Sequence, residues 1–439
     1  MREARSQSLR FEGLSPTGLG RALRPRGAGL EEVEVFATAP GDRARVLLGG
    51  RRKGRRQGWL QHLEEPAPGR VEPRCPHFGL CGGCALQHLD YEPALRAKTA
   101  TLQKALEERC PGGLPPCPAP SPWHYRGKLE LSFLGDPPEL GFFLRQRFSR
   151  LVAVRECFLA PPVNRTVLDA VRDWVQRHRL PGWNPRTHQG LLRNLVLRHS
   201  LATGDWLATL VTAPGEVPLD DLADRLVELG AAGVLHALNR SPAGAVVVES
   251  SRLVRGRERL IERVGEVELE LSWQSFFQNN PAGFALLLAQ AREWLAPISG
   301  YRLLDLFCGV GTVGLSLGRQ AGRLVGVESL PEAVEDARRN ARRNGVEGEF
   351  HQGRAEDWAD LAADVAVLDP PRAGCHPRLL ARLVREGPPR LLYISCNPWR
   401  LLEELDHLQP AYRLERWRLY DLFPQTPHVE ALCLLQRTP

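Results

Sequence analysis

The sequence RLLDLFCGVGTVG, from Arg302 to Gly314, places a glycine-rich loop directly after a short apolar run. Gly309, Gly311 and Gly314 satisfy the pattern G-x-G-x-x-G, in which glycines allow a tight turn and a close approach of the backbone to a nucleotide. Glu328 ends the next apolar run, 19 residues after Gly309, where a carboxylate accepts hydrogen bonds from ribose hydroxyls. This region therefore predicts a strand, a nucleotide-binding loop and the start of a helix.

Short apolar runs alternate with helical segments from about residue 300 onward. The apolar runs are Arg302–Phe307, Arg323–Glu328, Val365–Asp369 and Arg390–Ser395, and the predicted helices include Pro331–Asn344 and Pro377–Glu386. Apolar strands that are buried on both faces are typical of a parallel, doubly wound α/β sheet. Ligands of such sheets bind beyond the carboxyl ends of the strands, so the chemistry is expected at that edge.

The glycine loop by itself fits either NAD or S-adenosylmethionine (SAM). Asp305 places an acid inside the strand before the loop, which suits the amino group of SAM. The sheet also continues to Asp369-Pro370-Pro371-Arg372 at a strand end, a position common in SAM-dependent methyltransferases and unusual in dehydrogenases. These two features favour SAM as the cofactor.

Cys396 follows the apolar run Arg390–Ile394 directly, in the segment Ser395-Cys396-Asn397-Pro398. Cysteine is more often a buried structural residue, and Cys308 and Cys433, embedded in apolar runs, fit that interpretation. Cys396 lies instead at a strand end beside the predicted SAM site. We therefore predict that it is a nucleophile.

A thiolate next to a methyl donor suits methylation of uracil. Its addition to carbon 6 gives carbon 5 the carbanion character needed to take a methyl group, and a base must then remove the proton from carbon 5. Glu430, in Pro427-His428-Val429-Glu430 before the apolar run Ala431–Leu435, is the candidate base. Its spacing alone favours a plain carboxylate at a strand edge.

Three cysteines cluster well before this region, in the pattern C-x5-C-x2-C. Cys75, Cys81 and Cys84 place three thiolates within ten residues, whereas ten cysteines in 439 residues are too sparse for a disulfide scaffold. The cluster predicts a metal site in a reducing cytoplasm, with a fourth ligand from elsewhere. Four thiolates suit either zinc or an iron–sulfur cluster, and the spacing does not choose between them.

The remaining chain predicts two further parts before the doubly wound sheet. Residues 8–66 predict a small β-barrel, with strands at Glu31–Ala37 and Arg43–Leu48 and a basic cluster at Arg51–Arg56 that is expected to contact phosphates. Residues 124–265 mix strands and helices. The expected elements outside the barrel are a linker at Glu64–Arg74, a helix at Tyr91–Glu108, a proline-rich loop at Cys110–Trp123, strands at Lys128–Phe133, Leu191–Leu197, Trp206–Thr212 and Gly244–Ser250, and helices at Val163–Arg177 and Leu219–Leu229.

The net charge of +7 is concentrated near the start of the chain. Residues 1–74 hold 15 Lys and Arg against 9 Asp and Glu, so +6 falls in the predicted barrel and its linker. The composition, 43% hydrophobic and 25% charged, excludes a disordered or fibrous protein. The charged start predicts no secretory signal, and no apolar run reaches the ~18 residues of a membrane span. A soluble cytoplasmic protein is expected.

The segments DLFCGVGTVGL, DPPRAG, SCNP and PHVE, in this order, resemble the RNA 5-methyluridine (uracil-C5) methyltransferase family of the RumA/TrmA type. The segment CPHFGLCGGCALQH resembles that family's iron–sulfur motif, and the basic start resembles its TRAM domain, an RNA-binding OB-like barrel. The resemblance covers nearly the whole chain. It implies a TRAM-like domain at 1–68, a central α+β domain with the cluster at 69–265, and a Rossmann-like SAM-dependent methyltransferase domain at 266–439.

The resemblance also implies a role for individual residues. Cys396 would be the nucleophile and Glu430 the proton acceptor, and Arg372 would contact the substrate. The cofactor contacts implied are Gln278, Phe307, Gly309, Thr312, Glu328 and Asp369. Ala355 stands where relatives often carry a polar adenine contact, so Glu356 or Asp357 would have to replace it. Phe276 and Phe277 are candidates for stacking on bases, although adjacent phenylalanines are more often core residues.

For the metal site, the resemblance implies a [4Fe–4S] cluster rather than zinc, held by Cys75, Cys81, Cys84 and Cys157, with Cys110 and Cys117 as alternative fourth ligands. Its expected role is structural or in positioning RNA, because methyl transfer needs no redox step.

The expected function is methylation of carbon 5 of a uridine in 23S rRNA, giving 5-methyluridine. The resemblance favours rRNA because the shorter tRNA-type members lack both the TRAM domain and the cysteine motif. The alternatives are a tRNA uracil-5-methyltransferase, a cytosine-C5 methyltransferase and a non-catalytic iron–sulfur RNA-binding protein. RNA is the expected partner, with no membrane, no obligate protein partner and a monomeric state.

Overall fold

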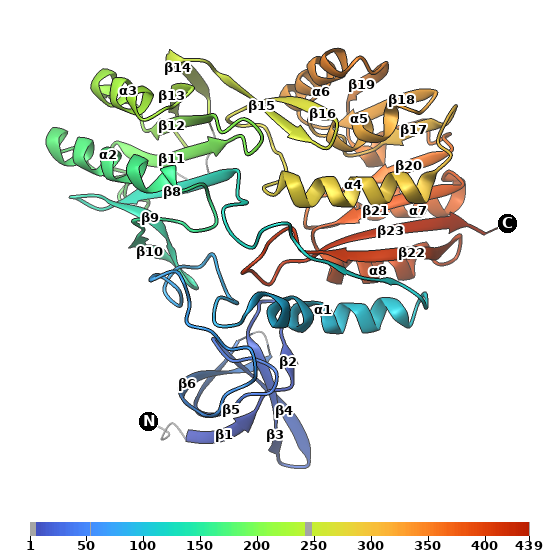
Figure 1. Cartoon of the computed structure of the whole chain (residues 1–439), viewed down its shortest axis with the longest axis horizontal. Helices are drawn as coiled ribbons and strands as arrows, with labels where there is room; N and C mark the ends of the chain where they lie inside the picture. Colours follow the sequence, from blue (N-terminus) through green and yellow to red (C-terminus); the bar gives the residue numbers. More distant parts are fainter. Residues whose placement is uncertain (1–5, 53, 242–247, 439) are drawn as a thin grey trace.

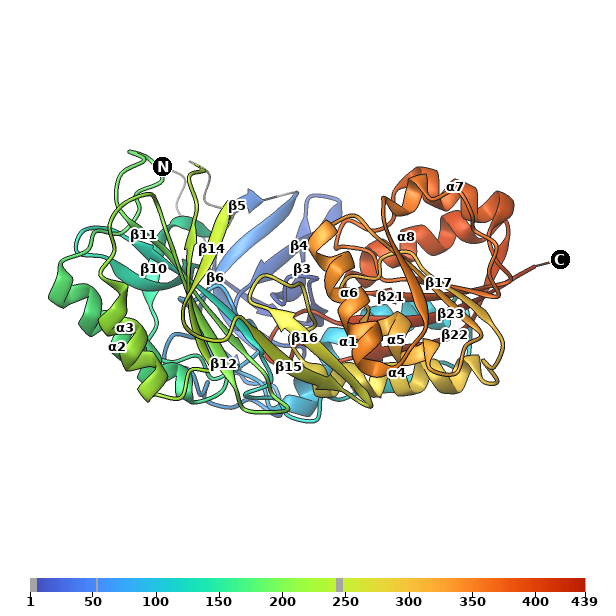
Figure 2. The same ribbon diagram turned by 90° about the horizontal axis from the view of Figure 1, so that it is seen from above.

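The computed structural model describes residues 6–52, 54–241 and 248–438. It contains an N-terminal sheet, a central sheet and a C-terminal sheet, which follow one another along the chain (Figure 1). Seen from above, the central and C-terminal sheets lie at opposite ends of the molecule (Figure 2). Within the described ranges, no helix has the length and apolar character needed to span a membrane.

The C-terminal sheet has the predicted doubly wound α/β topology. Five parallel strands continue into an antiparallel strand, β23. In spatial order the strands are β19 (Gly348–Gln352), β18 (Arg323–Glu328), β17 (Arg302–Asp305), β20 (Val365–Leu368), β21 (Arg390–Ser395), β23 (Glu430–Arg437), β22 (Tyr412–Tyr420) and β7 (Leu114–Cys117). The strand order reverses between β17 and β20, which is where such sheets bind their ligands.

Helices cover both faces of this sheet, as the doubly apolar strands require. One face packs against α4 (Pro281–Leu295), α5 (Thr312–Gly318) and α6 (Pro331–Asn344). The other packs against α1 (Tyr91–Glu107), α7 (Pro377–Glu386) and α8 (Pro398–Leu408). A short 3-10 helix, Ala355–Asp357, follows β19. The helices predicted at Pro331–Asn344 and Pro377–Glu386 are confirmed.

The prediction of a loop over the proline-rich segment Cys110–Trp123 is wrong in part. Leu114–Cys117 forms β7, which pairs in parallel with β22 although about 300 residues separate the two in sequence. Pro115 and Pro116 have no N–H to donate, which is tolerated because β7 is an edge strand. The segment between the cysteine cluster and the central sheet therefore contributes β7 to the edge of the C-terminal sheet, and α1 lies beside α8 on one face of that sheet (Figure 1).

The central part combines a seven-stranded sheet with two helices on one face. In spatial order the strands are β10 (Arg147–Ala153), β9 (Glu139–Leu144), β8 (Lys128–Leu134), β11 (Leu192–His199), β12 (Trp206–Thr212), β13 (Gly233–Leu238) and β14 (Ser250–Gly256). The helices are α2 (Val163–His178) and α3 (Leu219–Glu228), and their apolar faces share one core with the sheet. Most of the strand predicted at Gly244–Ser250 lies outside the described residues, and Ser250 begins β14. A hairpin, β15 (Arg259–Val264) and β16 (Val267–Ser272), leads to the C-terminal part.

The N-terminal part is a six-stranded sheet around a small apolar core. In spatial order the strands are β1 (Ser6–Arg10), β5 (Arg43–Arg52), β6 (Arg55–Glu65), β4 (Gly29–Val35), β3 (Gly20–Arg26) and β2 (Gly13–Leu14). The strand content agrees with the sequence, whereas barrel closure, a TRAM identity and the domain boundaries at 68/69 and 265/266 stay predictions.

Candidate active site at the carboxyl edge of the C-terminal sheet

The glycine-rich loop connects β17 to α5 at the strand-order reversal. Asp305, fully buried at the end of β17, accepts hydrogen bonds from the backbone N–H of Phe307 (3.4 Å) and Gly314 (3.0 Å). Gly309 and Gly311 have φ angles of +52° and +93°, a backbone region that favours glycine. The buried carboxyl group therefore fixes the loop, and burial raises the pKa of Asp305 to about 7.

Glu328 ends β18 beside this loop. One of its carboxylate oxygens accepts from the Gly309 N–H (3.1 Å), and the other accepts from the Leu330 N–H (2.9 Å). A side-chain carbon built on Gly309 would meet no other atom within 4 Å, so the loop faces open space there. Thr312 is buried at the start of α5, and Phe307 packs against the apolar core on the face of the sheet that α1, α7 and α8 cover. The surroundings of the loop fit a nucleoside whose ribose binds Glu328.

Cys396 directly follows β21 and lies close to Glu430, the first residue of the neighbouring strand β23. In the antiparallel pairing of β21 with β23, Ser395 faces Ala431, and this register places the next residue, Cys396, level with Glu430. Cys396 is half-buried, whereas Glu430 is completely buried. Strand pairing thus brings the predicted nucleophile and the predicted base to one point.

The electrostatic surroundings of this pair favour the protonated forms. Burial, together with the carboxyl groups of Glu430 and Asp369, raises the pKa of the Cys396 thiol to about 12, and the guanidinium of Arg372 acts in the opposite direction. Burial, assisted by Asp369, also raises the pKa of Glu430 well above its usual range. The pKa of Asp369 rises to about 7, through burial and the nearby Asp305. Such clustering of raised pKa values is typical of a functional site.

Arg372 and His428 border the pair from the side of the solvent. A guanidinium nitrogen of Arg372 lies 3.0 Å from Nδ1 of His428, and the backbone oxygen of Arg372 accepts from the Asn397 amide (2.9 Å). Burial and then Arg372 lower the pKa of His428 to about 4, so the imidazole is neutral near pH 7. Arg372 is exposed and can meet an anionic substrate.

The segment between β16 and α4 carries Gln278, which is half-buried. The two phenylalanines before it differ. Phe276 is 76% exposed and therefore open to stacking, whereas Phe277 packs against the apolar core. The Gly127 N–H donates to the Asn279 oxygen (3.0 Å), which ties this segment to the start of β8.

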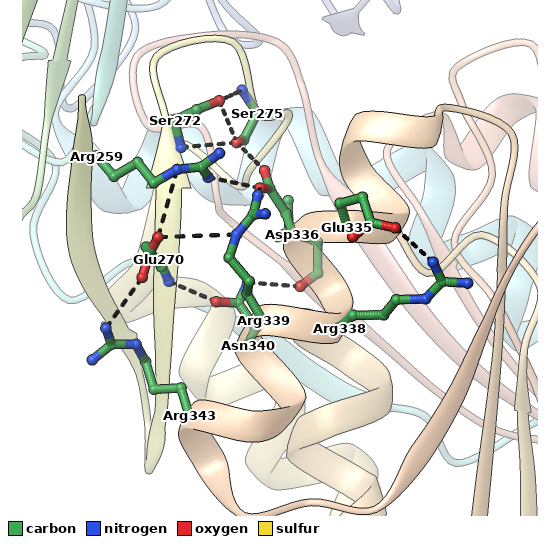
Figure 3. A network of polar contacts seen from close by, with 11 residues as sticks. Arg259, Glu270, Ser272, Ser275, Glu335, Asp336, Arg338, Arg339, Asn340 and Arg343 are labelled. Atoms are coloured by element: carbon green, nitrogen blue, oxygen red, sulfur yellow. Dashed lines mark hydrogen bonds and ion pairs between the residues drawn. The ribbon is translucent and has the colours of Figure 1, made fainter.

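A polar network fixes the beginning of the same segment to helix α6 (Figure 3). The Ser275 hydroxyl donates to the buried carboxylate of Asp336 (2.7 Å), which also accepts from Arg259 (2.7 Å) and from Arg339. Asn340, one turn further on, accepts from the Glu270 N–H and donates to the Val310 oxygen in the glycine loop. The segment that carries Gln278 and the glycine loop are therefore positioned by one helix.

Replacing Asp336 by alanine is expected to lower the free energy of unfolding by about 2–4 kcal/mol, because Ser275 and two arginines lose their acceptor. Urea denaturation measures this. Glu335→Ala is the matched control, since Glu335 is exposed on the same helix and pairs with Arg338, which is also exposed (Figure 3). Its expected cost is below about 0.5 kcal/mol. Equal losses for the two variants would contradict the role assigned to Asp336.

The short helix Ala355–Asp357 lies where an adenine contact is expected. Ala355 is buried in the core, and the carboxylate of Asp357 is exposed and pairs with Arg378 (2.7 Å). Glu356 is half-buried, and no ion pair involving it is present among the described residues. Of the two acidic candidates for the adenine contact, Glu356 is therefore the better placed to make it, because Asp357 is already paired with Arg378.

Cys75, Cys81, Cys84 and Cys157 line one cavity of about 600 Å³ between the N-terminal and central sheets. The Gly83 N–H donates to Sγ of Cys81 (3.4 Å). No three His, Cys, Asp or Glu side chains in the described ranges are arranged so that they would hold a metal ion. The alternative fourth ligands, Cys110 and Cys117, lie elsewhere, at the oxygen of Glu415 and in β7.

In the basic cluster Arg51–Arg56, Arg51 and Arg52 end β5 and Arg55 and Arg56 begin β6, whereas Lys53 lies outside the described residues. Its arginines are largely paired within the sheet. Arg51 and Arg56 lie 2.6 and 3.5 Å from carboxylate oxygens of Glu31, and Arg55 lies 2.9 Å from Glu34. The positive charge found in the sequence is thus partly neutralised in the fold, and its predicted contact with phosphates stays a prediction.

Lys98 was not singled out from the sequence, although it lies close to the candidate base. Its ammonium is buried among residues 421–428, directly before Glu430. The sequence does indicate that Lys98 is buried, because it falls on the apolar stripe of α1 with Leu95 and Leu102, at helical spacing. A lysine at such a position requires a buried polar partner.

Two family models match the C-terminal half of the chain. One is described as tRNA (Uracil-5-)-methyltransferase and matches residues 348–438. The other is a methyltransferase domain and matches residues 303–375. Together they cover the part of the chain, from residue 303 to residue 438, that carries the glycine loop, Cys396 and Glu430.

Similar proteins cover nearly the whole chain. An uncharacterized RNA methyltransferase of Halalkalibacterium halodurans is 31% identical over 93% of this chain and 94% of its own length. Another, of Caldanaerobacter subterraneus subsp. tengcongensis, is 32% identical, with 95% and 94% covered. The crystal structure of Pyrococcus abyssi tRNA (uracil-54, C5)-methyltransferase in complex with S-adenosyl-L-homocysteine is similar with a TM-score of 0.80 and 29% identity, covering 98% of this chain and 99% of that one.

Proposed function

Because the chain belongs to the RNA uracil-5-methyltransferase family, whose reaction is SAM-dependent, we propose that it methylates carbon 5 of a uridine in 23S rRNA through a covalent bond from Cys396 to carbon 6. The observation that carries this mechanism is the position of Cys396 opposite Glu430 at the paired ends of β21 and β23. A nucleophile and a base that meet beside a SAM-binding loop are what this reaction requires.

In the proposed reaction, the Cys396 thiolate adds to carbon 6 and moves the electron pair of the double bond toward carbon 5 and the carbonyl oxygen. SAM supplies a methyl group on a sulfonium sulfur, which leaves as the neutral thioether of S-adenosylhomocysteine. Glu430 then takes the proton from carbon 5. The electron pair of that C–H bond re-forms the double bond between carbons 5 and 6, and the bond from carbon 6 to Cys396 breaks to give back the thiolate.

The proposed cofactor contacts are those that the resemblance implies. Glu328 would bind the ribose, Phe307 would hold the cofactor with it, and Gly309 and Thr312 would supply the contacts of the glycine loop. Gln278 and Asp369 lie between cofactor and target base. The open space at Gly309 supports this assignment. A uridine in folded RNA must leave its stack to reach Cys396, and the exposed ring of Phe276 is available to stack on a neighbouring base.

A tRNA target is the second candidate. The Pyrococcus abyssi structure is named as a tRNA methyltransferase, and it is similar over 98% of this chain, including the N-terminal sheet and the cysteine segment. These two features therefore do not separate rRNA from tRNA, although the family resemblance associates them with enzymes acting on the large ribosomal subunit.

The target can be tested with unmodified RNA and methyl-labelled SAM. We expect the purified protein to form 5-methyluridine in 23S rRNA fragments, detected by nucleoside mass spectrometry, and not in tRNA transcripts. Methylation of tRNA alone would overturn the rRNA assignment. Methylation of neither RNA, with Cys396→Ala protein as the blank, would overturn the proposed function.

We also propose that Cys75, Cys81, Cys84 and Cys157 hold a [4Fe–4S] cluster. The shared cavity supports this. Four thiolates that face one space are the ligand set that such a cluster binds. The family resemblance names the same cluster.

Protein purified without oxygen is expected to contain about four iron atoms per chain and to absorb visible light. Cys157→Ser is expected to lose most of the iron, whereas the matched variant Cys110→Ser keeps it. Zinc in place of iron, or loss of iron from the Cys110 variant, would overturn the assignment. Cluster-free protein that binds and methylates RNA normally would show that the cluster has no structural role.

A further inference from the structure

The segment from Asp421 to Val429, here called the base loop, joins β22 to β23 and ends directly before Glu430. Lys98, from helix α1, projects into this loop. Its ammonium donates to the Asp421 carboxylate (2.7 Å) and to the backbone oxygens of Phe423 (3.3 Å), Thr426 (3.2 Å) and His428 (3.1 Å). The side chain of Lys98 is 3% exposed and that of Asp421 is 1% exposed. One buried ammonium group thus binds four residues of a nine-residue loop.

The loop folds around this ammonium and adds a few hydrogen bonds of its own among Asp421, Phe423, Thr426 and His428. Asp421 also accepts from the Phe423 N–H (3.1 Å), and the Thr426 hydroxyl donates to the Phe423 oxygen (2.7 Å). Three of the four acceptors of Lys98 are carbonyl oxygens, which converge on one point only because a cation is present there. Without it, the same oxygens would face one another with no donor, an unfavourable arrangement in a buried site.

Three other elements hold the outside of the loop. The Tyr125 hydroxyl donates to the Pro424 oxygen (2.9 Å), and the amide of Asn280, two residues after Gln278, donates to the Leu422 oxygen (3.3 Å). The N–H groups of Ala85 and Leu86, which directly follow Cys84, both donate to the oxygen of Gln425 (2.9 and 3.1 Å). The loop therefore contacts the cysteine segment, the central part and the start of α4.

In the described part of the structure, the side chain of Glu430 is not held by hydrogen bonds as the base loop is. Both carboxylate oxygens are buried, and neither has a hydrogen-bond partner among the described residues. Its orientation therefore depends on its backbone, which pairs with Tyr420 of β22 and is joined directly to the base loop. A shift of the loop would move the carboxylate relative to carbon 5 of a bound uracil, and misplacement of a base by about 1 Å is costly for proton transfer.

We propose that Lys98 is a positioning residue that holds the base loop so that Glu430 reaches the proton on carbon 5. The inference rests on the proposed function, because it concerns the last step of that reaction. It predicts a selective defect. Addition of Cys396 and transfer of the methyl group do not use Glu430, so both should survive the loss of Lys98, whereas release of the methylated RNA should not.

The test uses Lys98→Met, which keeps the length of the side chain and removes its charge. Lys104→Met is the matched control, because Lys104 is exposed on the same helix. With uridine RNA, Lys98→Met is expected to lower kcat about 100-fold, within the range that a general base contributes, with KM little changed. Covalent protein–RNA complex is expected to accumulate, which denaturing gels reveal. Lys104→Met is expected to behave like the wild-type protein.

With RNA carrying 5-fluorouridine, which has no proton for Glu430 to remove, adduct formation by Lys98→Met is expected within about threefold of the wild-type rate. In a Glu430→Gln background, Lys98→Met is expected to cause no further loss, because the two residues act in one step. Equal loss of turnover and adduct formation, an unchanged kcat, or a multiplicative loss in the double variant would each overturn the inference.

Tyr125→Phe provides a second test that removes only one hydrogen bond to the loop. It is expected to lower kcat about fivefold without slowing adduct formation, and a loss shared by both steps would count against the inference. If Lys98→Met does not fold, this variant decides the question. Failure of the proposed function is distinguishable, because the wild-type protein itself would then form no adduct with fluorinated RNA.

Discussion

Replacement of Cys396 by alanine is expected to abolish methylation of RNA, with a fall in kcat on the order of 10⁴ or more, as for other enzymes that lose a nucleophile. Without a thiolate, carbon 5 of uracil stays too weak a nucleophile for the methyl group of SAM. The measurement is the formation of 5-methyluridine in a single turnover with saturating protein.

The same variant should form no covalent complex with RNA that carries 5-fluorouridine, whereas the wild-type protein should form a stable one, because fluorine does not leave as a cation. Cys375→Ala is a suitable control, since Cys375 is a buried thiol that contacts the Tyr393 hydroxyl. An adduct with Cys396→Ala would contradict the assigned role.

Glu430→Gln is expected to lower turnover by a factor of about 10²–10⁴, the usual contribution of a general base. Glutamine fills the same buried space and takes up no proton. Addition and methyl transfer should continue, so the variant should accumulate methylated RNA bound to Cys396. A variant that turns over normally, or that forms no complex at all, would show that Glu430 is not the base.

The pH dependence of the wild-type rate provides a check on the same pair. Cys396 acts as a thiolate and Glu430 as a carboxylate, and burial raises the pKa of both groups. The active forms are therefore the deprotonated ones, and kcat/KM is expected to rise with pH through the neutral range. A rate that falls over this range would contradict the assignment.

The sequence predicted the C-terminal elements well because their signals are local. The strand Arg323–Glu328 and the helix Pro331–Asn344 have the predicted bounds, since proline begins the helix and Gly345 ends it in the left-handed region. β7 was missed for the opposite reason. Its prolines argue against a strand, and its partner β22 lies far away in sequence.

In the candidate site, too, local features could be predicted from the sequence, whereas contacts between distant residues could not. The position of Cys396 at a strand end is a local feature, whereas its approach to Glu430 depends on the register of β21 with β23, which no spacing in the sequence reveals. Lys98 could be found only once α1 was seen to pack against the base loop. The network around Asp336 likewise joins elements about 60–80 residues apart.

Strand β7 has a consequence for the protein at high concentration. The outermost strand of a sheet exposes unpaired N–H and C=O groups, which can pair with another molecule and start aggregation. β7 covers β22, and Pro115 and Pro116 give it an outer edge with fewer N–H groups than an ordinary strand. At this end, the largest sheet among the described residues thus finishes in a segment that is poorly suited to adding a further strand.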